Sequence, residues 1–277
     1  MKILITGSSG FIGKHLTEVL SVENEIYGID TFELRNSKIK TVAADLLDID
    51  QCKRIFREKQ ISQVDVIIHL ASVLANSANL NDADVLNYNN TLSSNIASLA
   101  MILGAEKIIN FSSSSVYPNM TGTFNESSQI DPSVNPDAIY GLSKFNSEMI
   151  IKKMLSAEKI CLSNLRCVMV YGEGVNKTRI WPVMEAELKD KNTITVFGNG
   201  ERIINQIQIK KLGEIVKKFV NGRYEGTYNI SEENISLYAL AERIIKQKGN
   251  TESKIVKVEK GNTSKFIVDI SKLKKLQ

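Results

Sequence analysis

Three glycines recur at every third position near the start of the chain, at Gly7, Gly10 and Gly13. They follow the apolar run KILIT and precede a segment from Phe11 to Leu20 in which apolar residues have helical spacing. The first glycine permits a tight turn, the second lets backbone N–H groups approach a ligand, and the third allows close packing of the helix. Because a helix N-terminus attracts anions, this junction predicts a strand, turn and helix that bind the pyrophosphate of a dinucleotide.

Short apolar runs alternate with amphipathic segments through the first part of the chain. The runs KILITG, EIYGID, DVIIHLAS and KIINFSSS are predicted to be strands, because they are rich in apolar and β-branched residues. Helical spacing follows at residues 11–20, 51–59, 90–103 and 140–155. Strands that are apolar almost throughout suit a parallel sheet covered by helices on both faces. The predicted fold class is therefore α/β, with a Rossmann-type doubly wound parallel sheet.

The pattern changes after residue 171, where a basic helix and a short strand TITVF follow. We expect a first domain at residues 1–171 and a smaller C-terminal lobe at residues 172–277. The apolar spacing of residues 209–220 predicts a helix that belongs with the first domain. The boundary is therefore not a single cut, and residues 205–222 are expected to return to the first domain.

The overall composition excludes several classes of protein. With 35 basic and 31 acidic residues the net charge is only +4, so a nucleic-acid partner is not indicated. The three cysteines show neither paired spacing nor a metal-ligand pattern, so no metal site is expected. The start MKILITG lacks the parts of a signal peptide, and no apolar run reaches membrane-spanning length. We expect a soluble cytoplasmic protein without a membrane partner.

The choice of dinucleotide is indicated by the second predicted strand, EIYGID, which ends in Asp30. A carboxylate at this position accepts hydrogen bonds from the adenosine ribose hydroxyls and repels a 2′-phosphate. NAD is therefore predicted as the cofactor. Arg35 and Lys38 follow closely, and they keep NADP open as the alternative.

A second group of residues has the side chains that proton transfer requires. Tyr140 and Lys144 are four residues apart in a predicted helix, so they lie on one helical face. An ammonium beside a phenol favours the phenolate, so Tyr140 can take or give a proton near neutral pH. The run FSSSSVY ends a predicted strand, and one of its hydroxyls can hold the substrate oxygen.

Several ordered blocks of the sequence resemble the extended short-chain dehydrogenase/reductase superfamily. They are TGSSGFIG, DLLD, HLAS, the Asn90 helix, SSSSVY, YGLSK and LRCVMVYG. Together they cover nearly the whole chain and are similar to the NAD-dependent epimerase/dehydratase branch, whose members act on nucleotide sugars. The resemblance implies a Rossmann domain with a smaller substrate-binding lobe and a nucleotide-sugar substrate.

The resemblance also implies roles for individual residues. The catalytic set would be Tyr140, Lys144 and Ser113, because the family's catalytic hydroxyl sits four residues before the tyrosine of the VY pair; Ser114 is the alternative. The implied cofactor-binding residues are Gly7, Gly10, Phe11, Ile12, Gly13, Asp30, Asp45, Leu46, Leu70, Ala71, Ser72, Asn90, Tyr140 and Lys144. From the residues alone, Asp45 can equally be a helix cap and Asn90 a surface polar residue.

The sequence departs from this family where the sugar is expected to bind. Family dehydratases place an Asp-Glu pair directly after the catalytic hydroxyl, whereas this chain has Ser114 and Ser115. Elimination of water needs a positioned acid and base, so a 4,6-dehydratase is not expected. Met169 and Ile204 stand where the family often has an Asn and an Arg aimed at the nucleotide sugar, and Lys210-Lys211 stand where it usually has an acidic pair, so the diphosphate-binding set is altered. The expected substrate-binding residues are therefore Ser113, Ser114, Arg179 and Arg202, with Lys177 as a further candidate.

Two reactions fit the remaining residues. In an epimerase acting at sugar carbon 4, Tyr140 takes a hydroxyl proton while NAD takes hydride, and hydride then returns to the other face. In a nucleotide-4-keto-6-deoxysugar reductase, NAD(P)H delivers hydride once while Tyr140 donates the proton. Asp30 favours the epimerase. A regulator that binds NAD without turnover is a third hypothesis. By resemblance, a homodimer is expected through the helices near residues 90–103 and 140–155.

Overall fold

A computed structural model describes residues 1–31 and 39–276 of the chain. The strands are β1 (Lys2–Thr6), β2 (Glu25–Asp30), β3 (Lys40–Ala43), β4 (Val66–His69), β5 (Lys107–Ser113), β6 (Gly122–Phe124), β7 (Cys161–Cys167), β8 (Met169–Tyr171), β9 (Thr193–Phe197), β10 (Ile203–Gln208), β11 (Gly226–Ile230), β12 (Glu233–Ser236), β13 (Lys254–Val258) and β14 (Phe266–Val268). The α-helices are α1 (Phe11–Leu20), α2 (Ile49–Glu58), α3 (Ala83–Ile102), α4 (Ala138–Met154), α5 (Ile180–Lys191), α6 (Ile209–Asn221), α7 (Leu237–Lys248) and α8 (Ser271–Lys274). Arg35 and Lys38 lie outside the described residues.

Seven strands form the main sheet in the order β11, β7, β5, β4, β1, β2, β3. Adjacent strands from β7 to β3 pair in parallel. The chain starts in the middle of the sheet and builds outward in both directions, which is the doubly wound topology. The predicted α/β class is therefore confirmed.

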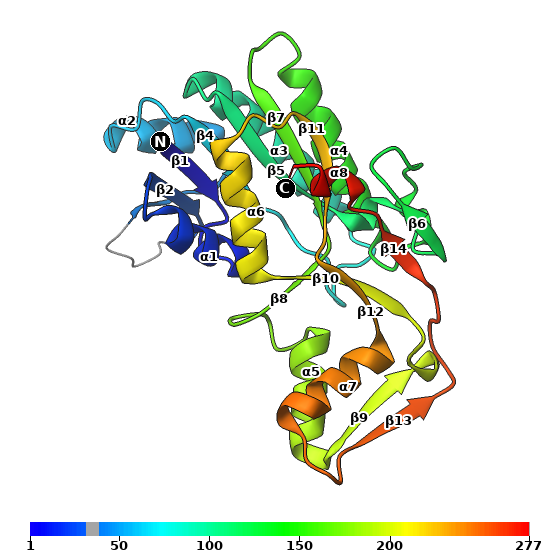
Figure 1. Cartoon of the computed structure of the whole chain (residues 1–277). Coiled ribbons are helices and arrows are strands. Elements are labelled where there is room, and N and C mark those ends of the chain that lie inside the picture. The colour runs from blue at the N-terminus through cyan, green and yellow to red at the C-terminus, as the bar shows by residue number, and fades with distance from the viewer. Residues whose placement is uncertain (32–38, 277) are drawn as a thin grey trace. The chain divides into compact units, whose positions relative to one another are not determined.

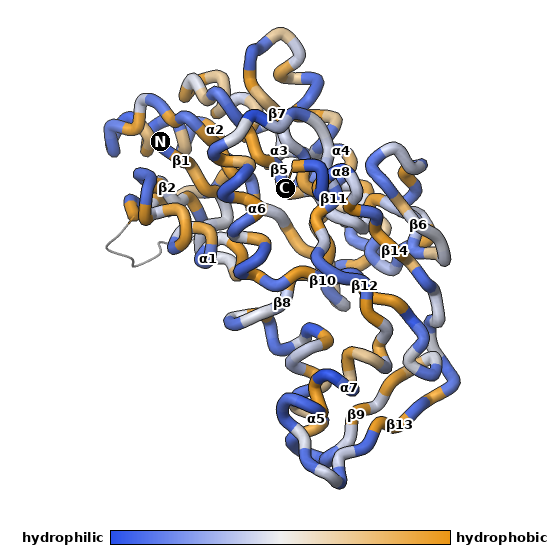
Figure 2. Tube along the Cα trace, viewed as in Figure 1, coloured by the Kyte–Doolittle hydropathy of each residue, from blue (hydrophilic) through white to orange (hydrophobic). Residues whose placement is uncertain are grey.

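Helices cover both faces of this sheet, as Figure 1 shows. Leu4 of β1 packs in a cluster with Phe56 of α2 and Ile96 of α3. Because side chains alternate along a strand, Ile3 and Ile5 point to the opposite face, on which α1 and α6 lie. All three β1 side chains are fully buried, and Figure 2 shows this strand in the hydrophobic colour. Burial on both faces explains the continuous apolar runs in the sequence.

The chain divides into two compact units. The first contains residues 1–118, 129–167 and 212–228, and thus the main sheet with α1 to α4 and most of α6. The second contains residues 119–128, 168–211 and 229–277. Its small sheets are β12-β10-β8, β13-β9 and β14-β6. Its core is formed by α5, α7 and β9, with Leu188, Ile194 and Leu240 at its centre.

Two predicted elements differ in their bounds from those observed. Helix α3 begins at Ala83 rather than near Asn90, because Asp82 caps its first turn by accepting from the Asp84 N–H. The continuous block LRCVMVYG is divided between two strands, β7 and β8, which belong to different sheets. Among the described residues, none of the helices combines the length and apolar character needed to span a bilayer.

Candidate functional site

The glycine-rich turn connects β1 to α1 at the carboxyl edge of the main sheet. Gly7 has φ +67°, a left-handed conformation that favours glycine, and a Cβ there would lie 2.9 Å from the Ala71 backbone nitrogen. A Cβ on Gly13 would overlap the carbonyl oxygen of Gly7. Phe11 and Ile12 form the first helical turn and are partly exposed. The first and third glycines are thus required by backbone packing.

Asp30 fastens this turn to the end of β2. One carboxylate oxygen accepts from the Ser9 N–H at 2.9 Å, and the other accepts from the Thr31 N–H at 2.8 Å. The second oxygen also accepts from the Thr31 hydroxyl at 3.3 Å, whereas the oxygen bonded to Ser9 has a further lone pair with which Asp30 can accept from a ribose hydroxyl. The carboxylate therefore orders the turn and remains chemically suited to the role that the sequence predicts for it.

The residues around this turn fit a dinucleotide. Gly10 is the N-cap of α1 and has no side chain that could cap the helix, and the first turn contains no acidic residue. The first N–H groups of α1 are therefore available to an anion such as a pyrophosphate. On α3, the Asn90 side-chain oxygen is buried without a hydrogen-bond partner among the described residues. A ligand group that donates a hydrogen bond would satisfy it.

The segment after β3 contains the predicted adenine neighbours. Asp45 is exposed, and its carboxylate accepts from the Leu47 N–H at 2.9 Å in a local turn. Asp48, not Asp45, caps α2. Leu46 is buried in the core, and its carbonyl accepts from the Asn95 side chain of α3 at 2.7 Å.

The segment Leu70 to Ser72 follows β4 and adjoins the glycine-rich turn. The N–H groups of Leu70 and Ala71 both donate to the Thr6 hydroxyl at 3.1 Å. Ser72 donates to the side-chain oxygen of Asn89 at 3.2 Å. The predicted cofactor residues at positions 7 and 70–72 therefore lie together in the first unit.

Asn89, which was not predicted, joins this segment to helix α4. It is buried, its oxygen accepts from the Val73 N–H at 2.8 Å, and its amide donates to the Val73 carbonyl and to the Ser143 hydroxyl. Because Ser143 precedes Lys144, this amide fixes the helix that carries the predicted catalytic pair. Position 89 precedes Asn90 in a run of two asparagines, and only the helical phase distinguishes them.

The predicted catalytic hydroxyl stands at the end of β5. Ser113 is half-buried, and its Oγ accepts from the Ser115 N–H at 3.1 Å. Ser114 begins a short 3₁₀ turn, and its carbonyl accepts from the Tyr117 N–H. Ser113, the residue selected by the family pattern, thus has a hydroxyl proton that remains available to donate.

Tyr140 and Lys144 lie on one face of α4, as their spacing predicts. The Lys144 ammonium is 5.6 Å from the centre of the Tyr140 ring and donates to the Phe111 carbonyl of β5 at 3.0 Å. Burial lowers the pKa of Lys144 to about 8. A desolvated cation beside the ring favours the phenolate form of Tyr140. Ser113, Tyr140 and Lys144 all belong to the first unit.

A buried ion pair holds α4 against the sheet one turn beyond Lys144. Glu148 and Arg166 of β7 form two hydrogen bonds, of 2.9 and 2.8 Å. Ser112 donates to Glu148 at 2.5 Å, and Arg166 donates to the Tyr117 hydroxyl at 2.9 Å. Every partner is buried, so breaking this network would leave an unpaired charge inside the protein.

His69 is buried at the end of β4. Burial, together with the nearby charge of Lys144, lowers the pKa of His69 to about 3, so the imidazole is neutral at physiological pH. Its Nδ1 lies 2.9 Å from the Thr6 hydroxyl, which already accepts two N–H bonds and therefore donates here. His69 thus supports the glycine-rich turn through Thr6.

The second unit contains the predicted arginines. Arg179 is exposed at the N-cap of α5, and Arg202 is half-buried just before β10. Tyr171 stacks on Trp181 with ring centres 4.7 Å apart. The groups of three or more histidine, cysteine, aspartate or glutamate residues that a metal would need are absent from the described part of the chain.

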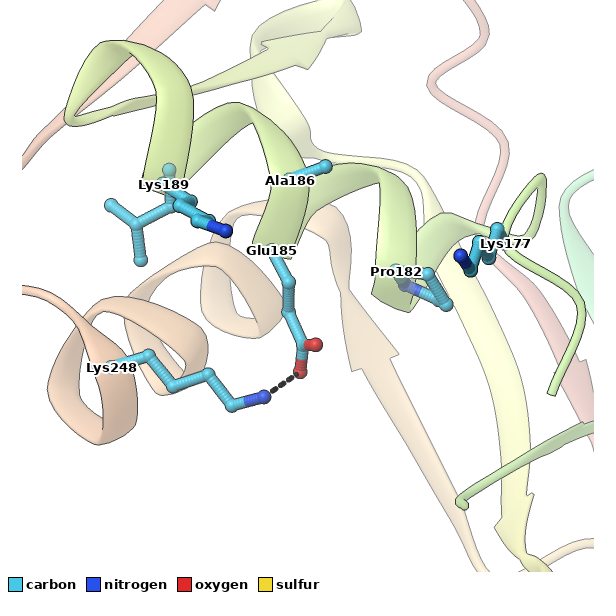
Figure 3. Close-up of a pocket in the computed structure, with 7 residues that line it drawn as sticks. Lys177, Pro182, Glu185, Ala186, Lys189 and Lys248 are labelled. Atoms are coloured by element: carbon cyan, nitrogen blue, oxygen red, sulfur yellow. Dashed lines mark ion pairs between the residues drawn. The ribbon is translucent and has the colours of Figure 1, made fainter. Parts of the chain in front are cut away.

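A pocket of about 500 Å³ lies on the surface of α5 and α7 in this unit. Figure 3 shows Glu185 of α5 reaching toward Lys248 of α7, with which it forms an ion pair of 2.8 Å. The lining residues are Lys177, Pro182, Glu185, Ala186, Leu188, Lys189 and Lys248. Of the predicted substrate residues only Lys177 is among them, so this pocket is not the candidate catalytic site.

Comparison with known proteins identifies the family. A model of the NAD dependent epimerase/dehydratase family matches residues 3–230. A dTDP-D-glucose 4,6-dehydratase from Dictyostelium discoideum is 25% identical over 272 residues, which covers 88% of this chain. The alignment spans only 61% of that relative's own length. The uncharacterized protein MJ1055 of Methanocaldococcus jannaschii is 30% identical over 191 residues, covering 62% of this chain and 57% of its own.

Solved structures share the fold over the whole chain. A UDP-N-acetylglucosamine 4-epimerase from Methanobrevibacter ruminantium superposes with a TM-score of 0.84 at 21% identity, covering 100% of this chain and 91% of its own. A UDP-glucuronic acid 4-epimerase from Bacillus cereus, solved with NAD, gives 0.81 at 22% identity, covering 100% and 90%. At this identity the likeness establishes the fold.

Proposed function

Because this chain belongs to the NAD dependent epimerase/dehydratase family, we propose that it is an NAD-dependent nucleotide-sugar epimerase that acts at sugar carbon 4. The observation that carries the proposal is the connected set of hydrogen bonds in the first unit. It runs from Thr6 at the glycine-rich turn through residues 70–73 to Asn89 and Ser143 of α4. Hydrogen bonds within the first unit thus connect the predicted cofactor turn to the helix that carries the predicted proton-transfer pair.

Several residues would hold NAD in this site. The first turn of α1 would bind the pyrophosphate, Asp30 the adenosine ribose, and the Asn90 side-chain oxygen would accept from a donor on the cofactor. Lys144 would donate to the nicotinamide ribose. The chemistry that bound NAD supplies is reversible hydride acceptance from a sugar carbon, by way of a keto sugar.

The proton steps belong to the protein. Tyr140 would take the proton of the sugar hydroxyl as its carbon is oxidised, and it would return the proton when the carbon is reduced. The Lys144 ammonium stabilises the phenolate, and Ser113 donates a hydrogen bond to the sugar oxygen. Because the proton returns to the oxygen it left, the protein needs no net proton exchange over one turnover.

Substrate binding by the second unit is part of the same proposal. Arg179 and Arg202 offer the planar, charged donors that suit a diphosphate, and we expect Arg179→Ala and Arg202→Ala to raise KM more than they lower kcat. If a nucleoside diphosphate binds both variants as tightly as it binds the wild type, Arg179 and Arg202 do not bind the diphosphate.

The epimerase and the alternatives differ in what they do with the cofactor. We expect the purified protein to retain NAD and to interconvert two sugar epimers without added cofactor. A panel of UDP, dTDP, CDP and GDP sugars, followed by NMR and mass spectrometry, checks this expectation. Stoichiometric consumption of NADPH with a 4-keto-6-deoxy sugar would decide for the reductase. Formation of a 4-keto-6-deoxy product would instead decide for a dehydratase, against the chemistry of Ser114 and Ser115.

A regulator without turnover is separated from both enzymes by one variant. If Tyr140→Phe leaves the biological activity unchanged, the protein does not act through proton transfer at this residue.

A further inference from the structure

A carboxylate from α4 lies beside the serine run that ends β5. The Ser115 hydroxyl donates to Asp137 Oδ2 at 2.8 Å. Ser115 is two residues beyond Ser113, and Asp137 is three residues, or about one helical turn, before Tyr140. The pair formed by Ser115 and Asp137 therefore adjoins the candidate catalytic set, within the same unit.

Asp137 does not have the ordinary role of an aspartate at its position. It is the N-cap residue of α4, yet its side chain makes no capping hydrogen bond. The other aspartates that begin described helices accept from a backbone N–H of the first turn; these are Asp48, Asp82 and Asp131. Since the Asp137 carboxylate forgoes this stabilisation for Ser115, its position is not explained by helix formation.

The two hydroxyls at the end of β5 are left with opposite hydrogen-bonding character. Ser113 Oγ accepts from the Ser115 N–H, so its proton is free to donate. The only hydroxyl proton of Ser115 is engaged in the hydrogen bond to Asp137. Toward any further group the Ser115 hydroxyl can therefore act only as an acceptor. Ser113 can therefore donate a hydrogen bond to a sugar oxygen that becomes a carbonyl, whereas Ser115 can accept a hydrogen bond from a donor group of the substrate.

The backbone of Ser115 is held in place from two directions. Asn135 donates to the Ser115 carbonyl at 2.6 Å and to the Tyr117 carbonyl at 2.8 Å. A Cβ on Gly141 would overlap the Ser115 carbonyl oxygen, so α4 packs directly on this turn. The hydroxyl and carboxylate are consequently preorganised, and the free energy of binding need not be spent on ordering them.

We propose that Ser115 and Asp137 form a specificity element, which accepts a hydrogen bond from a neutral sugar substituent and disfavours a carboxylate in its place. Asp137 is the positioning residue, since it acts through Ser115. The proposal rests on the proposed function and narrows its substrate class to sugars with a hydroxyl or amide donor rather than uronic acids. A substrate carboxylate would meet an acceptor oxygen and a second negative charge.

The test compares two ligands that differ only at sugar carbon 6, glucose and glucuronic acid joined to one nucleoside diphosphate. The nucleotide is the one of UDP, dTDP, CDP and GDP that the NAD-loaded protein binds most tightly. Titration calorimetry gives both dissociation constants. We expect the wild type to bind the glucose ligand at least about tenfold more tightly, the order of magnitude expected for a partly screened charge repulsion. Equal binding, tighter binding of the uronate, or binding of neither sugar overturns the proposal.

Variants separate this role from a structural one. Asp137→Asn keeps the shape and removes the charge, so the preference for glucose should fall by about tenfold, mainly through tighter binding of the uronate. Ser115→Ala should weaken the glucose ligand alone. Asp82→Asn is the matched control at the start of α3 and should leave both constants unchanged. Equal losses for both ligands in Asp137→Asn would contradict the proposal. If the dissociation constants follow the predicted ratios but no epimer forms, the result counts against the proposed reaction and still supports the specificity element.

Discussion

Among single residues, Tyr140 is the one on which the proposed proton transfer depends most. Replacing it with phenylalanine removes the group that exchanges the proton while keeping the ring beside Lys144. We expect kcat to fall by about 10² to 10⁴, the usual contribution of a general acid or base. The amount of retained NAD and the affinity for the nucleotide sugar should change little. Steady-state kinetics and cofactor extraction check both statements.

Tyr27→Phe is the control for that variant. Its ring is buried in the first unit, and its hydroxyl donates to the Glu25 side chain. Normal turnover is expected for it. A Tyr140→Phe protein with normal kcat would exclude the proton-transfer role.

Lys144 gives a prediction about stability and pH. Its pKa falls from the ordinary 10.5 to about 8 on burial, so between these values the unfolded chain binds more protons and the free energy of unfolding rises with pH. Lys144→Met removes the cost of burying the charge. It should be inactive, yet about 2 kcal/mol more stable at pH 7, after allowance for the lost hydrogen bond to Phe111.

That advantage should shrink as the pH rises from 8 toward 10.5, which urea unfolding at several pH values measures. Lys152→Met, at an exposed position of the same helix, serves as the control and should show no such trend. A constant difference across this range would mean that Lys144 is not a desolvated cation.

Residue types at fixed spacing were readable from the sequence, and contacts between distant segments were not. The spacing of Tyr140 and Lys144 places them on one helical face, and the structure brings them together. Asn89 and Asp137 carry no local motif, because their partners Ser143 and Ser115 come from other segments. Such residues become visible only when the fold is known.

At the scale of elements, Asn89 links the segment after β4 to helix α4. Asn89→Ala would leave the partly buried Val73 backbone groups without this partner and would remove the amide that donates to Ser143. We expect a loss of about 2 to 4 kcal/mol in the free energy of unfolding, together with weaker NAD binding. Chemical denaturation and a cofactor titration measure these effects.

Asn87 lies two residues earlier, on the exposed side of the same helix, so Asn87→Ala is the control for Asn89→Ala. Its stability should stay within about 0.5 kcal/mol of the wild type. If the two variants have the same free energy of unfolding, the hydrogen bonds of Asn89 do not stabilise the packing of helix α4 against the segment after β4.

The order of strands and helices could be predicted because apolar runs and helical periods are local properties. Element ends were less certain. Helix α3 starts seven residues earlier than predicted because the run NYNN at residues 87–90 interrupts the apolar period between the N-cap Asp82 and the apolar remainder of the helix. The break between β7 and β8 falls at Val168, inside a continuous apolar run that gives no local signal.

At the scale of the whole molecule, the surface of the first unit predicts a homodimer. Helices α3 and α4 pack against each other, and both expose large apolar side chains. These are Tyr88, Met101, Ile102, Leu142, Met149 and Met154. Exposed apolar residues gathered on neighbouring helices are typical of an interface. We therefore expect twice the monomer mass in light scattering, and a monomer for the double variant Tyr88→Glu and Met149→Glu.

Val22→Glu changes an apolar residue that is 80% exposed but lies just after α1, so it should leave the mass unchanged. A monomeric mass for the wild type at micromolar concentration would contradict the predicted homodimer.

In the proposed epimerase, hydride leaves one sugar carbon and returns to that same carbon within a turnover. The most direct measurement uses a nucleotide sugar deuterated at carbon 4, the NAD-loaded protein, ordinary water and no added cofactor, with NMR and mass spectrometry of the products. We expect both epimers to form and both to keep the deuterium at carbon 4. Loss of the deuterium to water, or turnover only with added NADPH, would contradict this expectation.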